Sequence, residues 1–202
     1  MINEVYRLVE LYKNDYKDFN AIIIEDDLDC RFKNKSRDEF IEYKTKRQIE
    51  IWKRLGKQIP IIFLYASPEI ETWFICDWNN SFQHVYEDKF FCLHLKKYLD
   101  EKIVKEYWQK GIENFGIEDE KYIKLSNLIQ DAVAVGVKDE ICNMYPDDTM
   151  PPEIRSIIDN RKLFYSKKLH GDQMLRNIEP VHFADQCNIY FKPAFIDLRE
   201  LK

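Results

Sequence analysis

The stretch that most constrains this sequence is residues 21–29, where an apolar run passes directly into acidic residues. The four apolar residues from Ala21 to Ile24 have the character of a short buried strand. Four acidic residues follow within the next five positions: Glu25, Asp26, Asp27 and Asp29. They are expected at the carboxyl end of the strand, where α/β sheets bind their ligands. Closely packed carboxylates repel one another unless a cation is present, and hard divalent cations prefer oxygen ligands. The pattern therefore predicts a metal site that acts on phosphate.

A second apolar segment predicts a small parallel sheet. Ile59 to Tyr65 is apolar throughout, as is typical of a strand covered on both faces. A helix is expected between the two strands, with Ser36 and Glu39 as a capping box and Gly56 at its end. Together with an opening helix over residues 2–17, this order is half of a parallel α/β fold. The expected buried face of the middle helix consists of Phe40, Tyr43, Ile49, Trp52 and Leu55.

The rest of the chain is expected to be mainly helical. Ser67 as the N-cap and Pro68 at the first helical position predict a helix that reads from residue 69 to residue 78. Pro151 and Pro152 predict the start of another helix, which is expected to end near Gly171. Shorter helices are expected near residues 173–178 and 195–201.

Two strands form a sheet that is too small to be stable alone. A third strand is therefore expected from Ala132 to Val137, from residues near Tyr190, or from a partner chain. That partner could be a second copy of this chain. On this interpretation residues 1–85 form the α/β core. Residues 86–202 form a mainly helical region that packs on the core and is not an independent domain.

Composition indicates a globular protein with reduced cysteines. The 202 residues are 45% hydrophobic and 33% charged, and the net charge of −5 argues against a wholly basic surface for nucleic acid, but not against a local basic patch. The five cysteines lack CxxC spacing, which favours free thiols in a cytosol. The N-terminus does not resemble a signal peptide, and the longest apolar stretch is too short to span a membrane. We therefore expect a soluble cytoplasmic protein with no membrane partner.

A second group of acids follows the second expected strand. Glu69 and Glu71 fall in the first turn of the next helix, so parallel strands would bring them beside the first group. Alternate strand residues share a side, so Glu25, Asp27 and Asp29 are expected to bind the metal while the intervening acid faces away. Two simpler explanations stay open, because a helix dipole favours acids in its first turn and a solvated loop can follow a strand.

These motifs resemble those of the TOPRIM-like proteins of the DUF4276 group. In that group a hydrophobic strand ends in an acid-x-acid motif followed by a nearby Cys, and here the segment from Glu25 to Cys30 stands in that place. The later E-x-W-x-x-x-D helix is similar to the segment Glu69 to Asp77. Tyr165-x-Lys167 and Cys187 are also similar to C-terminal features of the group.

The resemblance implies a TOPRIM-like fold that binds Mg²⁺ or Mn²⁺ and breaks or joins DNA phosphodiesters, as in topoisomerases, primases and OLD-type nucleases. Relatives occur beside ABC- or SMC-like ATPases in bacterial anti-phage defence systems. A TOPRIM domain normally has an earlier strand with a catalytic glutamate, and an Asp where Glu25 stands. Here that glutamate is supplied by Glu69 or Glu71, or by a partner, or the domain is catalytically degenerate.

An intact site would hydrolyse phosphodiesters with a metal that neutralises the phosphate charge. Glu71 is expected to complete the metal site or to act as the base, with Glu69 as the second choice. Lys167 is expected to contact the reacting phosphate, and Lys168 and Arg176 to join it in binding nucleic acid. An ordinary solvated helix face explains these three basic residues equally well.

Other enzyme classes fit less well. The four histidines lack the spacing of a zinc hydrolase, and no Gly-rich phosphate loop is present. A HAD-type phosphatase uses D-x-D after a strand, but its nucleophilic Asp should stand at the position of Glu25. The leading hypotheses are therefore a Mg²⁺-dependent nuclease that acts on DNA, and a non-catalytic subunit that docks on an ATPase.

Overall fold

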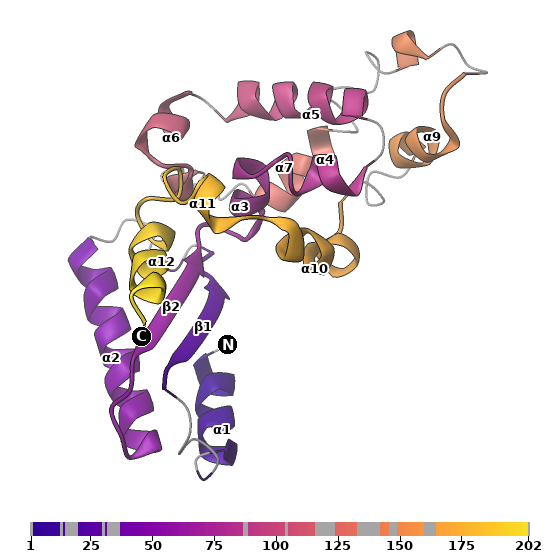
Figure 1. The fold of residues 1–202 in the computed structure, drawn as a ribbon. Coiled ribbons are helices and arrows are strands. Elements are labelled where there is room, and N and C mark those ends of the chain that lie inside the picture. The colour runs from indigo at the N-terminus through magenta and orange to yellow at the C-terminus, as the bar shows by residue number, and fades with distance from the viewer. Residues whose placement is uncertain are drawn as a thin grey trace.

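Two parallel strands, β1 (Ile22–Asp27) and β2 (Ile61–Ala66), form the sheet in the computed structural model (Figure 1). The register pairs Ile22 with Ile61 and Asp27 with Ala66, so the two carboxyl ends lie at the same edge. β1 is longer than its apolar run and includes the first three acidic residues. The structure describes residues 2–12, 14, 20–29, 31, 37–86, 89–103, 105–115, 124–132, 142–145, 149–159 and 165–201.

Two helices pack on one face of the sheet. α1 (Ile2–Tyr12) contacts α2 (Arg37–Leu55), and both contribute to one buried cluster with the strands. We call this the sheet cluster; it contains Val9, Ile24, Leu28, Phe40, Ile51, Ile61, Phe63 and Tyr65. Burying one such side chain stabilises the fold by about 1.5–3 kcal/mol.

The structure confirms the predicted helix between the strands but changes its buried face. α2 ends at Leu55, and Gly56 follows with a φ of 70°, the left-handed conformation that glycine adopts without strain. Ile51 is fully buried, whereas Ile49 is 41% exposed although it was expected in the core. Ile51 follows Phe40 by about three helical turns, so these two side chains share a face.

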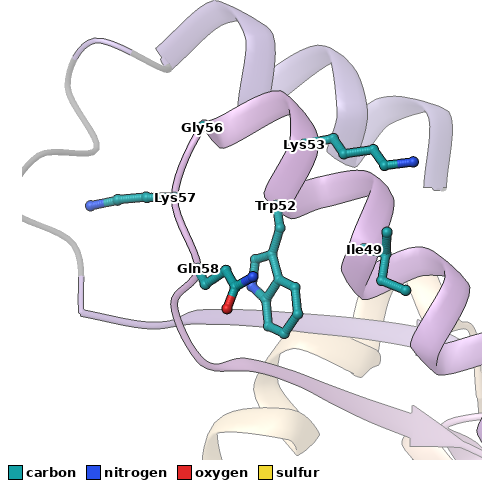
Figure 2. A pocket seen from close by; sticks show the side chains of 6 residues that line it. All are labelled: Ile49, Trp52, Lys53, Gly56, Lys57 and Gln58. Atoms are coloured by element: carbon teal, nitrogen blue, oxygen red, sulfur yellow. The ribbon is translucent and has the colours of Figure 1, made fainter.

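A pocket lies at the opposite edge of the sheet from the acids (Figure 2). It has a volume of about 400 Å³ and is formed by the end of α2 and the turn before β2. Trp52 closes one side, and its indole N–H donates to the Ile59 carbonyl at 2.8 Å. Ligands of parallel sheets bind at the carboxyl ends of the strands, so this pocket is not the candidate site.

The other described elements are mostly helical. They are α3 (Glu71–Cys76), α4 (Phe82–Val85), α5 (Lys89–Lys102), α6 (Lys105–Lys110), the 3-10 helix η2 (Ile112–Asn114), α7 (Leu125–Asp131), α9 (Pro152–Asp159), α10 (Lys167–Asn177), α11 (Pro180–Phe183) and α12 (Phe191–Arg199). They bury a second, aromatic-rich core, the helical cluster, which includes Trp73, Phe74, Phe82, Phe91, Tyr165, Phe183 and Phe191. None of the described helices is long and apolar enough to cross a membrane.

A helix lies beside β2 where a third strand was expected. Tyr190 belongs to the turn before α12, and α12 packs along β2 (Figure 1). Ala132 is buried at the end of α7, and residues 133–137 lie outside the described part of the chain. Within that part the sheet therefore has two strands, and α12 supplies apolar cover that a further strand would otherwise give.

The single helix expected from Pro152 to Gly171 is wrong. α9 ends at Asp159, Tyr165 and Ser166 are not helical, and α10 begins at Lys167. The Ser166 backbone is extended, and its N–H donates to Nδ1 of His170 at 3.1 Å, which fixes a new helix start. Gly171 is buried inside α10, and the helices expected near residues 173–178 and 195–201 are parts of α10 and α12.

Candidate functional site

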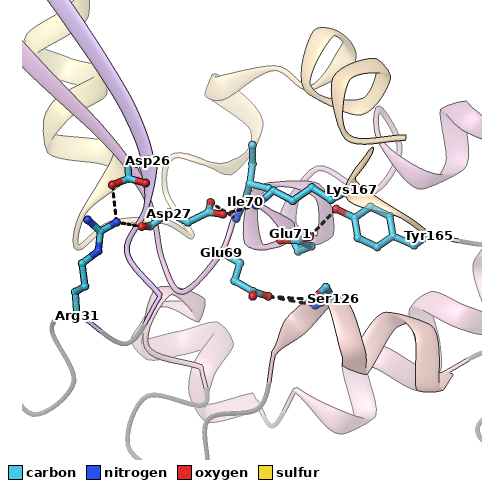
Figure 3. A network of polar contacts seen from close by, with 9 residues as sticks. All are labelled: Asp26, Asp27, Arg31, Glu69, Ile70, Glu71, Ser126, Tyr165 and Lys167. Atoms are coloured by element: carbon cyan, nitrogen blue, oxygen red, sulfur yellow. Dashed lines mark hydrogen bonds and ion pairs between the residues drawn. The ribbon is translucent and has the colours of Figure 1, made fainter. Parts of the chain in front are cut away.

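β1 delivers its acids to two sides of the sheet. Asp26 lies on one side and pairs with Arg31, whose Nη2 is 2.6 Å from its Oδ2 (Figure 3). Asp27 points the other way, toward the start of α3 (Figure 3). Partial burial raises the pKa of Glu25, and the charge of Asp27 raises it further. Side chains alternate between the two sides of a strand, so Asp26 lies on the side opposite to Glu25 and Asp27, as expected.

Asp29 is positioned by a turn instead of by the strand. β1 ends at Asp27, Leu28 is buried in the sheet cluster, and Asp29 has a φ of 48°. The Asp29 N–H donates to the Pro68 carbonyl at 2.8 Å. The regular alternation that was expected to align Asp29 with Glu25 and Asp27 therefore stops before this residue. Its role as a metal ligand stays a prediction.

Asp27 connects the ends of the two strands to the helices that follow. Its Oδ1 accepts the Ile70 N–H at 2.9 Å, just before α3, and its Oδ2 forms an ion pair with Nζ of Lys167 (Figure 3). The strand register makes this reach short, because it pairs Asp27 with Ala66. A carboxylate at the N-terminus of a helix also interacts favourably with the helix dipole.

The predicted cap of α3 by Ser67 is therefore wrong. The Ser67–Pro68 peptide bond is cis, and α3 begins at Glu71, so Pro68 is not its first residue. The buried Ser67 hydroxyl donates instead to the Glu113 carbonyl at 2.8 Å. Residues 67–70 thus form a turn that η2 holds on one side and Asp27 on the other.

Glu71 is a buried carboxylate at the start of α3. It is 1% exposed, and its Oε1 accepts the Tyr165 hydroxyl at 2.6 Å (Figure 3). Its Oε2 is also buried and has no hydrogen-bond partner within the described part of the chain. Burial raises the pKa of Glu71, against the effects of the Tyr165 hydrogen bond and the Lys167 charge. Burial and the Glu71 charge likewise raise the pKa of Tyr165, which therefore stays a hydroxyl donor.

Glu69 and Lys167 complete the group. The Ser126 N–H donates to Oε2 of Glu69 at 3.3 Å (Figure 3). Lys167 is the first residue of α10, and its ammonium interacts with Asp27, Glu71 and Glu69. Burial lowers the pKa of Lys167, but the hydrogen bond and charge of Asp27 outweigh this and leave the pKa raised. We refer to Glu25, Asp27, Glu69, Glu71, Tyr165 and Lys167 together as the acidic edge.

The acidic edge holds four carboxyl groups around one ammonium, so its charge favours a further cation. Its acidic donors are all oxygens, which suits Mg²⁺ or Mn²⁺ better than a soft metal. The orphaned Oε2 of Glu71 is an additional ligand atom of this kind. Across the residues that the structure describes, no three His, Cys, Asp or Glu side chains stand together closely enough to hold an ion. The donors therefore fit a hard cation in chemical kind, but in this arrangement they do not form a ready-made cation site.

Of the three predicted basic residues, one reaches the acids. Lys168 is exposed on α10, and Arg176, 76% exposed, pairs with Asp172 at 3.0 Å. Only Lys167 among these three belongs to the acidic edge. In the sequence, Tyr165 was part of the family resemblance but had no predicted role, and Ser126 was not among the candidate residues. The Y-x-K spacing was the one indication that Tyr165 and Lys167 act together.

Fold and site thus define an α/β protein with a lysine-containing carboxylate cluster at the carboxyl edge of a parallel sheet. No protein-family model, curated protein or solved structure matches the chain in the comparisons with known proteins.

Proposed function

We propose that this protein is a metal-dependent nuclease, or the nuclease subunit of a complex, that hydrolyses DNA phosphodiesters. The observation that carries the proposal is the convergence of Asp27, Glu71 and Lys167 from three separate parts of the chain. Burial of the Glu71 carboxylate destabilises the fold, since each buried polar atom without a partner costs about 1–3 kcal/mol. Stability alone therefore does not explain why a carboxylate stands here. The parallel strands with acids at their carboxyl ends support a TOPRIM-like core.

The metal proposed for the site is Mg²⁺ or Mn²⁺. Glu25, Asp27 and Glu71 would hold it, with Asp29 as a further ligand from the turn and Glu69 as an alternate to Glu71. When bound, the ion supplies charge neutralisation at the phosphate oxygens and a more acidic water. The orphaned Oε2 of Glu71 supports this assignment, because it is a ligand atom without a partner of its own.

The side chains have separate roles in this proposal. Lys167 contacts the phosphate with an ammonium that the surrounding acids keep charged. If Glu71 does not complete the metal site, it accepts the proton of the attacking water, a task for which its raised pKa makes it a better acceptor than an ordinary carboxylate. Tyr165 holds Glu71 in place through the hydrogen bond at 2.6 Å. Lys168 and Arg176 are proposed to contact the DNA backbone away from the reacting phosphate.

The test is DNA cleavage by the purified chain. Plasmid and linear DNA are incubated with Mg²⁺, with Mn²⁺ or with EDTA, and the wild type is compared with Asp27→Asn and Glu71→Gln. Both substitutions keep an oxygen acceptor for the Ile70 N–H or the Tyr165 hydroxyl, so they remove charge with little change in shape. We expect metal-dependent cleavage and a loss of about 100-fold or more in each variant.

Glu42→Gln is the matched control, because Glu42 is an exposed α2 residue that pairs only with Lys46 in the described structure. It should cleave like the wild type. If the wild type cuts neither substrate with either metal, alone or with a candidate ATPase, the nuclease proposal fails. Equal cleavage by Glu71→Gln and wild type would remove Glu71 from the mechanism.

A non-catalytic subunit that docks on an ABC- or SMC-like ATPase is the second candidate, and one observation favours it. Both oxygens of Asp27 are already engaged, one by the Ile70 N–H and one by Lys167. The acidic edge is thus partly neutralised by the chain itself. If the protein is such a subunit, we expect no DNA cleavage, no change in the free energy of unfolding when Mg²⁺ is added, and a stable complex with the ATPase. The resemblance to the DUF4276 group supports a role in bacterial anti-phage defence for either candidate.

A further inference from the structure

Two cysteines that are distant in the sequence meet behind the acidic edge. Cys76 is the last residue of α3 and is half-buried, whereas Cys187 is fully buried between α11 and α12. Cys76 packs against the buried cluster that contains Cys187, and it lines a pocket together with Gln186, the chain neighbour of Cys187. The two thiols therefore lie close together and interact. The backbone around Cys187 is held on both sides, since its N–H donates to the Phe183 carbonyl at 2.9 Å and its carbonyl accepts the Lys192 N–H at 2.8 Å.

The two thiols differ in their access to solvent. Cys76 lines a surface pocket of about 610 Å³, together with Lys96, Lys105 and Trp108. Lys96 also forms an ion pair with Asp100 at 2.7 Å. An exposed thiol is oxidised more readily than a buried one. A small oxidant that enters this pocket therefore meets Cys76 first.

Cys187 has the properties of a second thiol that reacts from behind. Burial, the hydrogen bond with Cys76 and the charge of Glu113 raise the pKa of Cys187, so it stays protonated and does not react with solvent oxidants. Its thiol nevertheless lies beside that of Cys76, which lines the pocket. A protected thiol beside an accessible one is the arrangement in which a first oxidation product is captured within the same chain.

We propose that Cys76 and Cys187 form an oxidisable dithiol that reduces a hydroperoxide and becomes an intramolecular disulfide. In the first step the Cys76 sulfur attacks hydrogen peroxide, an S–O bond forms, the O–O bond breaks, and the leaving hydroxide takes up a proton to become water. In the second step the Cys187 sulfur attacks Cys76, the S–S bond forms, the S–O bond breaks, and the leaving hydroxide takes the Cys187 proton. Two thiols thus lose two electrons in total, and one peroxide becomes two waters.

The disulfide would connect α3 to the segment that leads into α12. Glu71 stands at the other end of α3, so oxidation would fasten the helix that carries the central carboxylate of the acidic edge. The dithiol itself does not depend on what that edge binds, and its test needs no activity measurement.

The test uses the full reduced chain, treated with a small excess of hydrogen peroxide and then blocked with N-ethylmaleimide. Intact mass and peptide mapping should show the loss of two hydrogen atoms and a peptide that joins Cys76 to Cys187, reversible by dithiothreitol. In Cys187→Ser, Cys76 should stop at the sulfenic acid and be trapped by dimedone. In Cys76→Ser, Cys187 should stay reduced. If circular dichroism shows that the Cys76→Ser protein is unfolded, Cys76→Ala is used in its place.

Cys142→Ser is the matched control, because Cys142 is exposed and stands outside this pair. It should form the same disulfide as the wild type. The proposal is overturned if peroxide leaves the wild type without a Cys76–Cys187 peptide, if Cys76 is oxidised to the sulfinic acid instead, or if Cys142→Ser abolishes the bond.

Discussion

At the scale of single residues, the contact between Tyr165 and Glu71 is the most informative. The two groups come from distant parts of the chain and are both buried, with a hydroxyl-to-carboxylate distance of 2.6 Å. A hydrogen bond to a buried carboxylate is stronger than one at the surface, because few water molecules compete for either partner. The position of Glu71 in the acidic edge therefore depends on Tyr165.

We predict that Tyr165→Phe lowers the free energy of unfolding by about 1–3 kcal/mol, because it leaves both Glu71 oxygens buried without this donor. Urea denaturation of the wild type, Tyr165→Phe, Glu71→Gln and the double variant measures the coupling between the two side chains. Additive effects in this cycle would show that the hydrogen bond contributes nothing of its own.

At the scale of elements, Glu113 decides how α12 begins. Its side chain is fully buried, and its carboxylate accepts the N–H groups of Ile189, Tyr190 and Phe191 at 2.6, 3.0 and 3.0 Å. These N–H groups precede or open α12, where no earlier carbonyl of the helix can satisfy them. η2 thus caps α12, while the Glu113 carbonyl accepts the Ser67 hydroxyl.

This cap makes a testable contribution to the pH dependence of stability. Burial raises the pKa of Glu113 to about 7, although the three backbone N–H groups act in the opposite direction. The folded state therefore binds the proton more tightly than the unfolded state, whose pKa is near 4.5. The stability from this group is complete below the unfolded pKa and is lost as the pH rises through the folded pKa, by at most about 3 kcal/mol.

We predict that Glu113→Gln removes this pH dependence, because an amide does not titrate. It should destabilise the protein by about 1–3 kcal/mol at low pH, because the amide nitrogen, unlike the hydroxyl oxygen of the protonated carboxyl, cannot accept a backbone N–H. The measurement is urea denaturation of both proteins across the interval from the unfolded to the folded pKa. Glu200→Gln, at an exposed position after α12, is the control and should follow the wild type. A parallel pH slope in Glu113→Gln would contradict the assignment.

At the scale of the whole molecule, the sheet cluster and the helical cluster are joined at several points. β2 contributes Tyr65 to the first and Ala66 to the second. The Tyr190 ring, held through Glu113, lies 4.8 Å from the Phe40 ring in the sheet cluster. These links through β2 and Tyr190 couple the stability of the two clusters, because neither can lose its packing without disturbing the other.

We therefore predict that the chain unfolds in a single cooperative transition. Trp52 packs against the sheet cluster, whereas Trp73 and Trp78 belong to the helical cluster. Trp52→Phe confines the fluorescence to the helical part, and its urea midpoint should coincide with that from far-UV circular dichroism. Two separated midpoints would show that the sheet and helical parts unfold as independent units.

The sequence by itself determined the elements whose causes are local. The apolar runs predict β1 and β2, the periodicity and Gly56 predict α2, and the acids after each strand predict a charged edge on a parallel sheet. These predictions rest on side-chain spacing within one segment, which a sequence displays directly. The phase of α2 shows where this reasoning stops, since apolar character alone did not tell Ile51 from Ile49.

Only the tertiary structure decided which groups meet at that edge. Asp27, and not Ser67, accepts the Ile70 N–H just before α3. Lys167 and Tyr165 reach the acids because the helix ends before residue 165 and α10 begins at Lys167. A cap or an ion pair between distant segments depends on packing, and the same residue types satisfy many other partners equally well. The acids could thus be located from the sequence, but their partners could not.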